Sequence, residues 1–256
     1  MMSDTLTDEQ LLRYSRQILM PEMDVAGQLC LANARVLVVG AGGLGCPVVL
    51  YLAAAGVGEL TVADSDTVEL TNLQRQIAFT MADIDCFKAE VLAERAMATN
   101  PDCRVVPMVA RLEGEALDAA VANSDLVLDA SDNFATRFAV NAACVKHGVP
   151  LVSGAAIRAE GQVAVFDARQ KDSPCYRCLY AIDGDEALNC SQAGVLGPLV
   201  GMIGTTQAME AIKILAGVGQ SLTGQLLLLD ALTLQWRSLK LPRDPECPVC
   251  GPRHQG

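Results

Sequence analysis

The chain has 256 residues, of which 51% are hydrophobic and only 4% aromatic, so it can bury one substantial core built mainly from Ala, Val and Leu. Its formal net charge of -11 would repel phosphate backbones and anionic lipid over most of the surface. Nucleic acid is therefore not an expected partner, and any nucleotide must be held by a local cationic pocket.

Cysteine usage and the N-terminus bear on the cellular location. The first residues are polar and acidic, without a basic segment followed by an apolar one, so we expect no secretory signal. Ten cysteines then indicate a reducing cytoplasm, where thiols act as metal ligands, nucleophiles or core filler. Two long uncharged runs, 36–58 and 191–209, contain too many glycines, together with prolines, for membrane spans, and we expect no membrane partner.

Helices and strands are predicted to alternate through the first 153 residues. Two helices come first, from Asp8 to about Met20 and from Asp24 to about Asn33. Strands are then expected at 35–39, 59–64, 103–108, 125–130 and 149–153, and helices between them at 43–56, 84–99, 113–122 and 133–147. Strands separated by helices are typical of a parallel, doubly wound sheet.

The pattern changes after Ser153. Strand-like runs at 162–167, 225–230 and 234–241 have only one long helix among them, at 199–216. The predicted fold is therefore α/β and Rossmann-like, with a mostly parallel sheet extended by antiparallel strands. We expect a single domain over 1–256, in which 1–34 is an N-terminal helical attachment and 168–256 is a C-terminal part closed by paired cysteines.

A glycine turn, Gly40-Ala41-Gly42-Gly43-Leu44-Gly45, directly follows the first strand, and Asp64 closes the next one. In a dinucleotide-binding turn, glycine backbone approaches a phosphate at a helix N-terminus and a carboxylate accepts from ribose hydroxyls. Considered alone, this spacing indicates NAD and an oxidoreductase. A tight turn without a ligand is the structural alternative.

Basic and amide side chains after the ribose-binding strand indicate a different nucleotide. Asn72 and Arg75 lie in a run of hydrogen-bonding residues, Lys88 follows near the start of the next helix, and Arg16 lies in the first helix. Each basic residue alone fits a solvated surface charge. Together they suit ATP better than NAD, because transfer at the α-phosphorus requires charge neutralisation.

The strand 125–130 is apolar and is followed by Asp132 and Asn133, with Asp129 near its end. Open α/β sheets bind ligands at this carboxyl edge, where a carboxylate can hold Mg²⁺ against phosphates. We favour Asp132 over Asp129 for that role. The alternative is that Asp132 or Asn133 caps the following helix.

Two CxxC pairs, Cys175 with Cys178 and Cys247 with Cys250, can supply four thiolates to a tetrahedral Zn²⁺. A redox function is the alternative, but neither pair lies at the strand-to-helix turn that redox motifs use. Four protein ligands leave no exchangeable position. We therefore expect a structural zinc that clamps the C-terminal tail onto a distant loop.

The other cysteines divide into two groups. Buried filler positions are expected for five of them: Cys30, Cys46, Cys86, Cys103 and Cys144. Cys190 ends a polar run that reads as a loop, so it is a candidate nucleophile, although its acidic neighbours would disfavour the thiolate.

A family resemblance emerges from the order of these motifs. They are Arg13 to Gln17, the glycine turn, Asn72 to Gln76, Lys88, Ser131 to Asn133 and both CxxC pairs. This set resembles the MoeB/ThiF family of enzymes, which activate ubiquitin-like sulfur carriers, over nearly the whole chain. The resemblance implies an ATP- and Mg²⁺-dependent reaction in which the C-terminal glycine carboxylate of the carrier attacks the α-phosphate. Pyrophosphate leaves, and the acyl adenylate is ready for sulfur transfer.

The resemblance also implies residue roles. Asp64 would bind the ribose, Arg75 and Lys88 the phosphates and Asp132 the magnesium, with Gly43, Asn72 and Asn133 also at the nucleotide. Arg16 would reach into the partner subunit's site, which implies a homodimer. Cys190 matches a loop cysteine that links covalently to the carrier in ThiF-type enzymes and is dispensable for adenylation in MoeB-type ones.

The identity of the carrier is less well determined by the sequence. The segment 153–162 resembles MoeB-type enzymes, which act on the small subunit of molybdopterin synthase, whereas 79–85 and 235–239 resemble ThiF-type enzymes of thiamine biosynthesis. We favour the molybdopterin-type carrier, a small protein with a Gly-Gly terminus, and expect sulfur to come from a separate donor. An NAD-dependent oxidoreductase and a nucleotide-binding adaptor without turnover are the other hypotheses.

Overall fold

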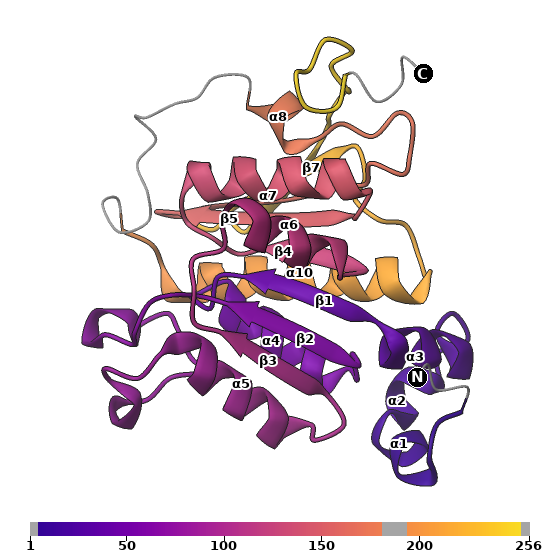
Figure 1. Cartoon of the computed structure of the whole chain (residues 1–256), viewed down its shortest axis with the longest axis vertical. Coiled ribbons are helices and arrows are strands. Elements are labelled where there is room, and N and C mark those ends of the chain that lie inside the picture. Colours follow the sequence, from indigo (N-terminus) through magenta and orange to yellow (C-terminus); the bar gives the residue numbers. More distant parts are fainter. Residues whose placement is uncertain (1–4, 181–193, 252–256) are drawn as a thin grey trace.

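The computed structural model describes residues 5–180 and 194–251, and its centre is one eight-stranded sheet (Figure 1). The strand order is β3-β2-β1-β4-β5-β6-β7-β8. The strands are β1 (Arg35–Val39), β2 (Glu59–Ala63), β3 (Arg104–Met108), β4 (Leu126–Asp129), β5 (Leu151–Ile157), β6 (Glu160–Phe166), β7 (Gln225–Asp230) and β8 (Gln235–Lys240). Strands β1 to β5 pair in parallel, and β6, β7 and β8 add to β5 in antiparallel pairings. The predicted sheet, including its antiparallel extension, is confirmed.

Helices cover both faces of the sheet (Figure 1). Helices α4 (Gly45–Ala54), α5 (Lys88–Thr99) and α10 (Gly197–Ala216) contribute to the core on one face. Helices α6 (Gly114–Ala122) and α7 (Phe134–His147) contribute to the core on the other. The remaining helices are short or peripheral: α1 (Asp8–Arg13), α2 (Ser15–Ile18), α3 (Asp24–Asn33), η1 (Leu70–Asn72), η2 (Met81–Asp83) and α8 (Tyr176–Leu179).

Strand β1 shows why the sheet is central. Its last four residues are apolar and buried, and successive side chains point to opposite faces. Val36 and Val38 join the core beside α4, whereas Leu37 and Val39 join the core beside α7. A strand buried on both faces is necessarily apolar throughout, so its sequence shows no alternation.

Three predicted elements differ in their boundaries. The expected helix from Asp8 to about Met20 is divided into α1 and α2 at Tyr14, whose side chain turns into the core. Helix α5 starts at Lys88 rather than near residue 84, because 81–83 form the short helix η2, where Asp83 accepts hydrogen bonds from Thr80. Strand β5 continues past Ser153 to Ile157, because its last residues pair with β6.

The burial predicted for the cysteines is correct in three cases and wrong in two. Cys46, Cys103 and Cys144 are buried, and burial raises the pKa of Cys46 and Cys103 to about 12, which keeps both as thiols. Cys30 is exposed because it lies on the outer side of α3, and Cys86 is exposed in the loop before α5. Among the residues described, no helix combines the length and apolar composition needed to cross a membrane.

The N-terminal helices are attached to the sheet domain through buried polar contacts. Asn100 Nδ2 donates to Tyr14 Oη and to the Ala53 carbonyl, both at 2.7 Å. Gln17 and Gln28 donate to the Ala55 carbonyl at 3.0 and 2.9 Å. These bonds satisfy polar groups at the end of α4 that the N-terminal helices would otherwise bury without partners.

The attachment can be tested with Tyr14→Phe, which removes the hydroxyl and keeps the ring. We expect the free energy of unfolding in urea to fall by about 1 kcal/mol, the typical contribution of one hydrogen bond. Tyr51→Phe is the matched control, because Tyr51 is 57% exposed, and we expect it to stay within ~0.5 kcal/mol of the wild type. Equal effects of the two substitutions would contradict the role given to Tyr14.

Candidate active site

A pocket of about 410 Å³ lies at the carboxyl ends of β1, β2, β3 and β4. From β1 the chain adds β2 and β3 on one side of the sheet and then β4 and β5 on the other. The pocket lies where this direction changes. Ligands of open α/β sheets bind at such a switch point. The volume falls in the range that accommodates a nucleotide-sized molecule.

The glycine turn forms one wall of the pocket through Gly40, Gly42 and Gly43. Gly40 has φ +101, and a Cβ there would lie 2.7 Å from the Ala130 carbonyl oxygen. At Gly45, where α4 begins, a Cβ would lie 2.0 Å from the Gly40 carbonyl oxygen. The turn therefore needs glycine at both positions, and it places the N-terminus of α4 beside the pocket, where a phosphate is favoured.

Asp64 lies directly after β2 and is fastened to the glycine turn. Its Oδ2 accepts from the Ala41 amide at 2.7 Å, and its Oδ1 accepts from the Asp66 amide at 2.8 Å. Burial raises the pKa of Asp64, while these two amide donors act in the opposite direction. The carboxylate is thus held in one orientation, with lone pairs left to accept from ribose hydroxyls.

Two cations and an amide enter the pocket from the segment between β2 and α5. Lys88 is 8% exposed at its side chain, and its Nζ donates to Asp66 Oδ2 at 2.9 Å. Arg75 Nη1 donates to the Thr71 carbonyl at 3.0 Å, and Asn72 Oδ1 accepts from the Glu69 amide at 3.2 Å. Each side chain is positioned by a local contact, and the three line the same pocket.

The structure at the end of β4 shows which residue caps the next helix and which faces the pocket. Asn133 caps α7, because its Oδ1 accepts from the Thr136 amide at 2.9 Å, so the capping role does not fall to Asp132. Asp132 lines the pocket. Asp129 is fully buried below it, where Oδ1 accepts from the Ser131 amide and hydroxyl at 3.0 and 2.6 Å. Burial raises the pKa of Asp129.

The structure therefore brings together most of the residues predicted for the nucleotide site. Seven of them line the pocket: Gly43, Asp64, Asn72, Arg75, Lys88, Asp132 and Asn133. Arg16 is exposed in α2 and is not among the described residues that line it. Cys190 lies outside the described residues.

Four charged residues that sequence reasoning missed also line the pocket: Asp66, Glu69, Arg111 and Arg137. Arg111 follows β3 at the same edge at which Asp64 follows β2, so the position alone could have indicated it. Arg137 lies one turn into α7 and is 8% exposed, which no local pattern signals. The pocket thus contains cations and carboxylates together, a combination that suits phosphates with a bound divalent ion.

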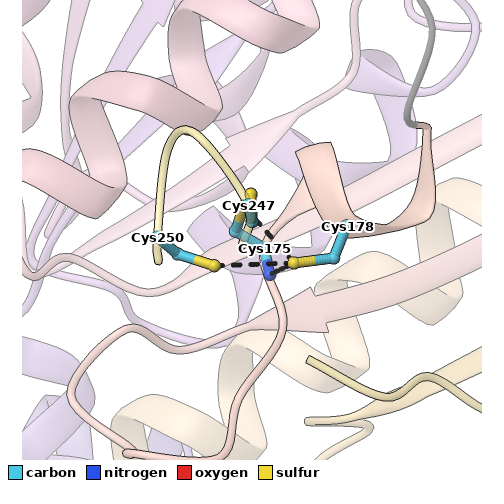
Figure 2. Close-up of side chains that lie close together, drawn as sticks. All are labelled: Cys175, Cys178, Cys247 and Cys250. Atoms are coloured by element: carbon cyan, nitrogen blue, oxygen red, sulfur yellow. Dashed lines mark hydrogen bonds between the residues drawn. The ribbon is translucent and has the colours of Figure 1, made fainter. Parts of the chain in front are cut away.

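The four predicted zinc ligands converge outside the pocket, in a separate cluster beside α7. Figure 2 shows the thiols of Cys175, Cys178, Cys247 and Cys250 meeting from α8 and the C-terminal segment, and their sulfur atoms all lie within 4.8 Å of one another. Sγ separations are 3.7 Å for Cys175 and Cys247, 4.0 Å for Cys178 and Cys175, and 3.5 Å for Cys178 and Cys250. A tetrahedron with Zn–S bonds of about 2.3 Å has sulfur atoms about 3.8 Å apart, so the cluster fits zinc.

Contacts within the cluster favour one thiolate, at Cys178, whereas a hydrogen bond to Cys178 raises the pKa of Cys175 and burial raises the pKa of Cys250 to about 11. Hydrogen bonding, first from Cys175 and then from the backbone amides of Cys175 and Asp244, lowers the pKa of Cys178 to about 5. Apolar groups, including Val145 and Val249, surround the cluster. The clamp joins residues 72 positions apart in sequence, as expected for a structural metal.

The glycine requirement can be tested with Gly45→Ala. Because the added methyl group would overlap the Gly40 carbonyl, we expect a loss of unfolding free energy of at least about 2 kcal/mol and weaker nucleotide binding. Gly201→Ala is the matched control, since a Cβ there meets nothing within 4 Å on α10, and it should stabilise the protein by up to about 1 kcal/mol. Urea unfolding measures both, and a neutral Gly45→Ala would be inconsistent with this geometry.

The metal clamp can be tested with Cys247→Ser, which removes one of four thiolates. We expect the zinc content of the purified protein, measured by atomic absorption, to fall well below one ion per chain, and the thermal midpoint to drop because metal binding contributes to folding. Cys30→Ser is the control, because Cys30 is exposed and distant from the cluster in sequence. Full zinc retention in Cys247→Ser would exclude a four-thiolate site.

Comparison with known proteins agrees with this geometry. A model of the ThiF family matches residues 14–249. The molybdopterin-synthase adenylyltransferase of Salmonella typhimurium is 50% identical over 246 residues, covering 96% of this chain and 98% of the relative. The sulfur carrier protein ThiS adenylyltransferase of Escherichia coli is 48% identical over 246 residues, covering 96% and 97%. A crystal structure of E. coli MccB with ATP matches in fold, with a TM-score of 0.81 and 24% identity over 93% of this chain and 74% of that chain. The chain therefore belongs to the ThiF family.

Proposed function

We propose that this protein is an ATP-dependent adenylyltransferase that activates the C-terminal glycine carboxylate of a ubiquitin-like sulfur-carrier protein. One observation carries the proposal: the pocket unites seven predicted nucleotide-binding residues in a chain about half identical, over nearly its full length, to relatives named as adenylyltransferases of this kind. In the reaction, a carrier carboxylate oxygen attacks the α-phosphorus, the bond to the β-phosphate oxygen breaks, and pyrophosphate leaves.

The charges of the pocket support ATP over NAD. Asp64, Arg75 and Lys88 line the same pocket, and we assign the Asp64 carboxylate to the ribose and the two cations to the phosphates. Hydride transfer needs no cations there, so the NAD hypothesis leaves both residues without a role. Phosphoryl-type transfer needs them, because negative charge must be neutralised as the α-phosphorus is attacked and pyrophosphate departs.

Lys88 is held by Asp66 before any phosphate arrives. A phosphate entering the pocket would accept a hydrogen bond from one of the three ammonium N–H groups of Lys88, and another N–H group can still donate to Asp66. The lysine is therefore ordered in advance, which lowers the entropic cost of binding the phosphate.

A divalent cation fits the oxygen ligands of the pocket. We expect Asp132 to hold Mg²⁺, because it lines the pocket. The side-chain oxygen of its neighbour Asn133 is already used to cap α7. Carboxylate oxygen is the ligand that Mg²⁺ prefers, and the ion would supply charge neutralisation at the phosphates.

The carrier that we favour is the small subunit of molybdopterin synthase, with the ThiS-type carrier of thiamine biosynthesis as the alternative. The proposed carrier ends in Gly-Gly, and sulfur comes from a separate donor protein in the cytoplasm. Arg16 is exposed and outside its own chain's pocket, which supports a homodimer in which this residue serves the partner subunit. Cys190 is the candidate for a covalent link to the carrier.

The reaction can be tested with purified protein, ATP, magnesium and each of the two carriers. We expect carrier-dependent pyrophosphate and a gain in carrier mass that matches AMP, larger with the molybdopterin-type carrier. A thioester between the carrier and Cys190, formed as the thiol displaces AMP from the carrier adenylate, would appear as an adduct that thiols cleave and that Cys190→Ser abolishes. Faster adenylation of the ThiS-type carrier would select the alternative, and absence of pyrophosphate with both carriers would refute the proposal.

Arg75→Ala and Asp132→Ala test the assigned residues. We expect each to lower the rate of pyrophosphate formation by about 100-fold or more, the usual effect of losing one charge-stabilising group. Arg104→Ala is the matched control, because Arg104 is an exposed arginine on β3 that pairs with Glu59, and its rate should match that of the wild type. Circular dichroism confirms folding, and a folded variant of normal rate would remove that residue from the mechanism.

A further inference from the structure

A series of buried contacts runs along α7 between the cysteine cluster and the pocket. At the cluster, Tyr176 lies between the ligands Cys175 and Cys178, and its backbone amide donates to Asn141 Oδ1 at 2.8 Å. Asn141 is 1% exposed, and its Nδ2 is buried without a hydrogen-bond partner among the described residues. The same side chain lies against Cys175 Sγ, where a metal-bound thiolate would accept from it.

Arg137 lies one helical turn before Asn141 and contacts the pocket wall. Its Nη2 donates to the Ser131 carbonyl at 2.7 Å and approaches the Gly154 carbonyl at 3.5 Å. Ser131 immediately precedes Asp132, so this guanidinium holds the backbone that carries the proposed magnesium ligand. The same contact holds the passage from β4 into α7, because Ser131 lies between the end of β4 and Asn133, the residue that caps α7.

The guanidinium is kept in place by partners that are themselves buried. The negative charge of Asp129 faces it from β4, and the Tyr176 hydroxyl lies beside it. Arg137 Nε and Asp129 Oδ2 are buried without a hydrogen-bond partner in the described part of the chain. A buried polar network with unused groups is sensitive to small displacements, because each polar atom depends on the position of its neighbours.

The ring of Tyr176 packs between the cluster and this network. It packs edge-on against Phe138 at 5.5 Å and Phe166 at 6.0 Å between ring centroids, and against Tyr180 at 4.9 Å. The Phe134 ring lies 5.8 Å from Arg137 Cζ. A metal bound by Cys175 and Cys178, which flank Tyr176 in the sequence, would therefore restrict the movement of the Tyr176 ring. This ring and that of Phe134 are the aromatic groups beside Arg137.

We propose that Arg137 is a positioning residue that couples the zinc clamp to the nucleotide pocket, so that zinc binding strengthens ATP binding. The coupling rests on the proposed function, since it acts on the loop that carries Asp132. Zinc fixes Tyr176, Tyr176 and Asp129 hold the Arg137 guanidinium, and Arg137 holds the Ser131 carbonyl. Because coupling between sites is reciprocal, bound ATP must in turn help the chain to retain zinc.

Two measurements on the full chain test the coupling. Calorimetry gives the Kd of Mg-ATP for zinc-loaded and zinc-stripped protein, and a chromophoric chelator gives the rate of zinc release from the loaded protein with and without Mg-ATP. We expect the wild type to bind ATP about tenfold more tightly when loaded, within the usual range of coupling, and to release zinc correspondingly more slowly with ATP. The release measurement needs no folded zinc-free protein.

Arg137→Lys keeps the positive charge beside Asp129 and loses the planar group of donors. For this variant we expect the rate of zinc release without ATP to exceed the rate with ATP by less than about twofold. A ratio of 1 would mean that the two sites are independent. Arg169→Lys is the matched control, because Arg169 pairs with Asp167 through two nitrogens away from the pocket residues. It should keep the wild-type effect. If ATP itself chelated zinc, it would change the release rate by the same factor in the wild type and in both variants.

Two outcomes would overturn the inference. One is a wild type that binds ATP and forms pyrophosphate but releases zinc at the same rate with and without ATP, which would leave the proposed function standing. The other is an Arg137→Lys variant that keeps the full ATP effect. A general loss of stability in this variant would change both release rates and leave their ratio unaltered, so the ratio separates positioning from a purely structural role.

Discussion

The backbone at the carboxyl ends of β1 and β4 approaches so closely that no side chain fits between the strands, and the rest of the site depends on this approach. Gly40 lies against the Ala130 carbonyl, and Gly45 lies against Gly40 itself. This packing starts α4 at the pocket wall, and Asp64 fastens the turn by accepting from the Ala41 amide. The helix terminus proposed for a phosphate and the carboxylate proposed for the ribose are thus set by one close contact between strands.

The pocket resolves an electrostatic problem that the chain's composition creates. A protein with a net charge of -11 must bind a polyanion, and it does so by gathering cations at one edge of the sheet. Lys88 is paired with Asp66, and Arg137 is buried facing Asp129. Acidic partners order these cations and offset their charge, so positive charge is confined to one pocket of an otherwise acidic protein.

The cysteine cluster extends this organisation across the other face of the sheet. It lies beyond α7, while the N-terminus of α7 forms part of the pocket. Helix α7 contacts the cluster side through Asn141 and the pocket side through Arg137. A structural metal can therefore affect the nucleotide pocket, which a clamp that held only the C-terminal segment could not do.

Local sequence determined a large part of this protein. The apolar run 36–39 predicts a buried strand, and paired CxxC motifs predict a metal cluster before any geometry is known. Order along the chain was enough to predict the parallel sheet and its antiparallel extension. The family resemblance, together with the rule that the carboxyl ends of parallel strands meet at one edge, suggested seven residues that the structure brings to one pocket. Only the tertiary structure decided which polar groups share a contact. The break at Tyr14 and the burial of Arg137 depend on partners 86 and 6 positions away in sequence, Asn100 and Ser131. No periodicity encodes such pairings, because they follow from how elements pack after each has formed.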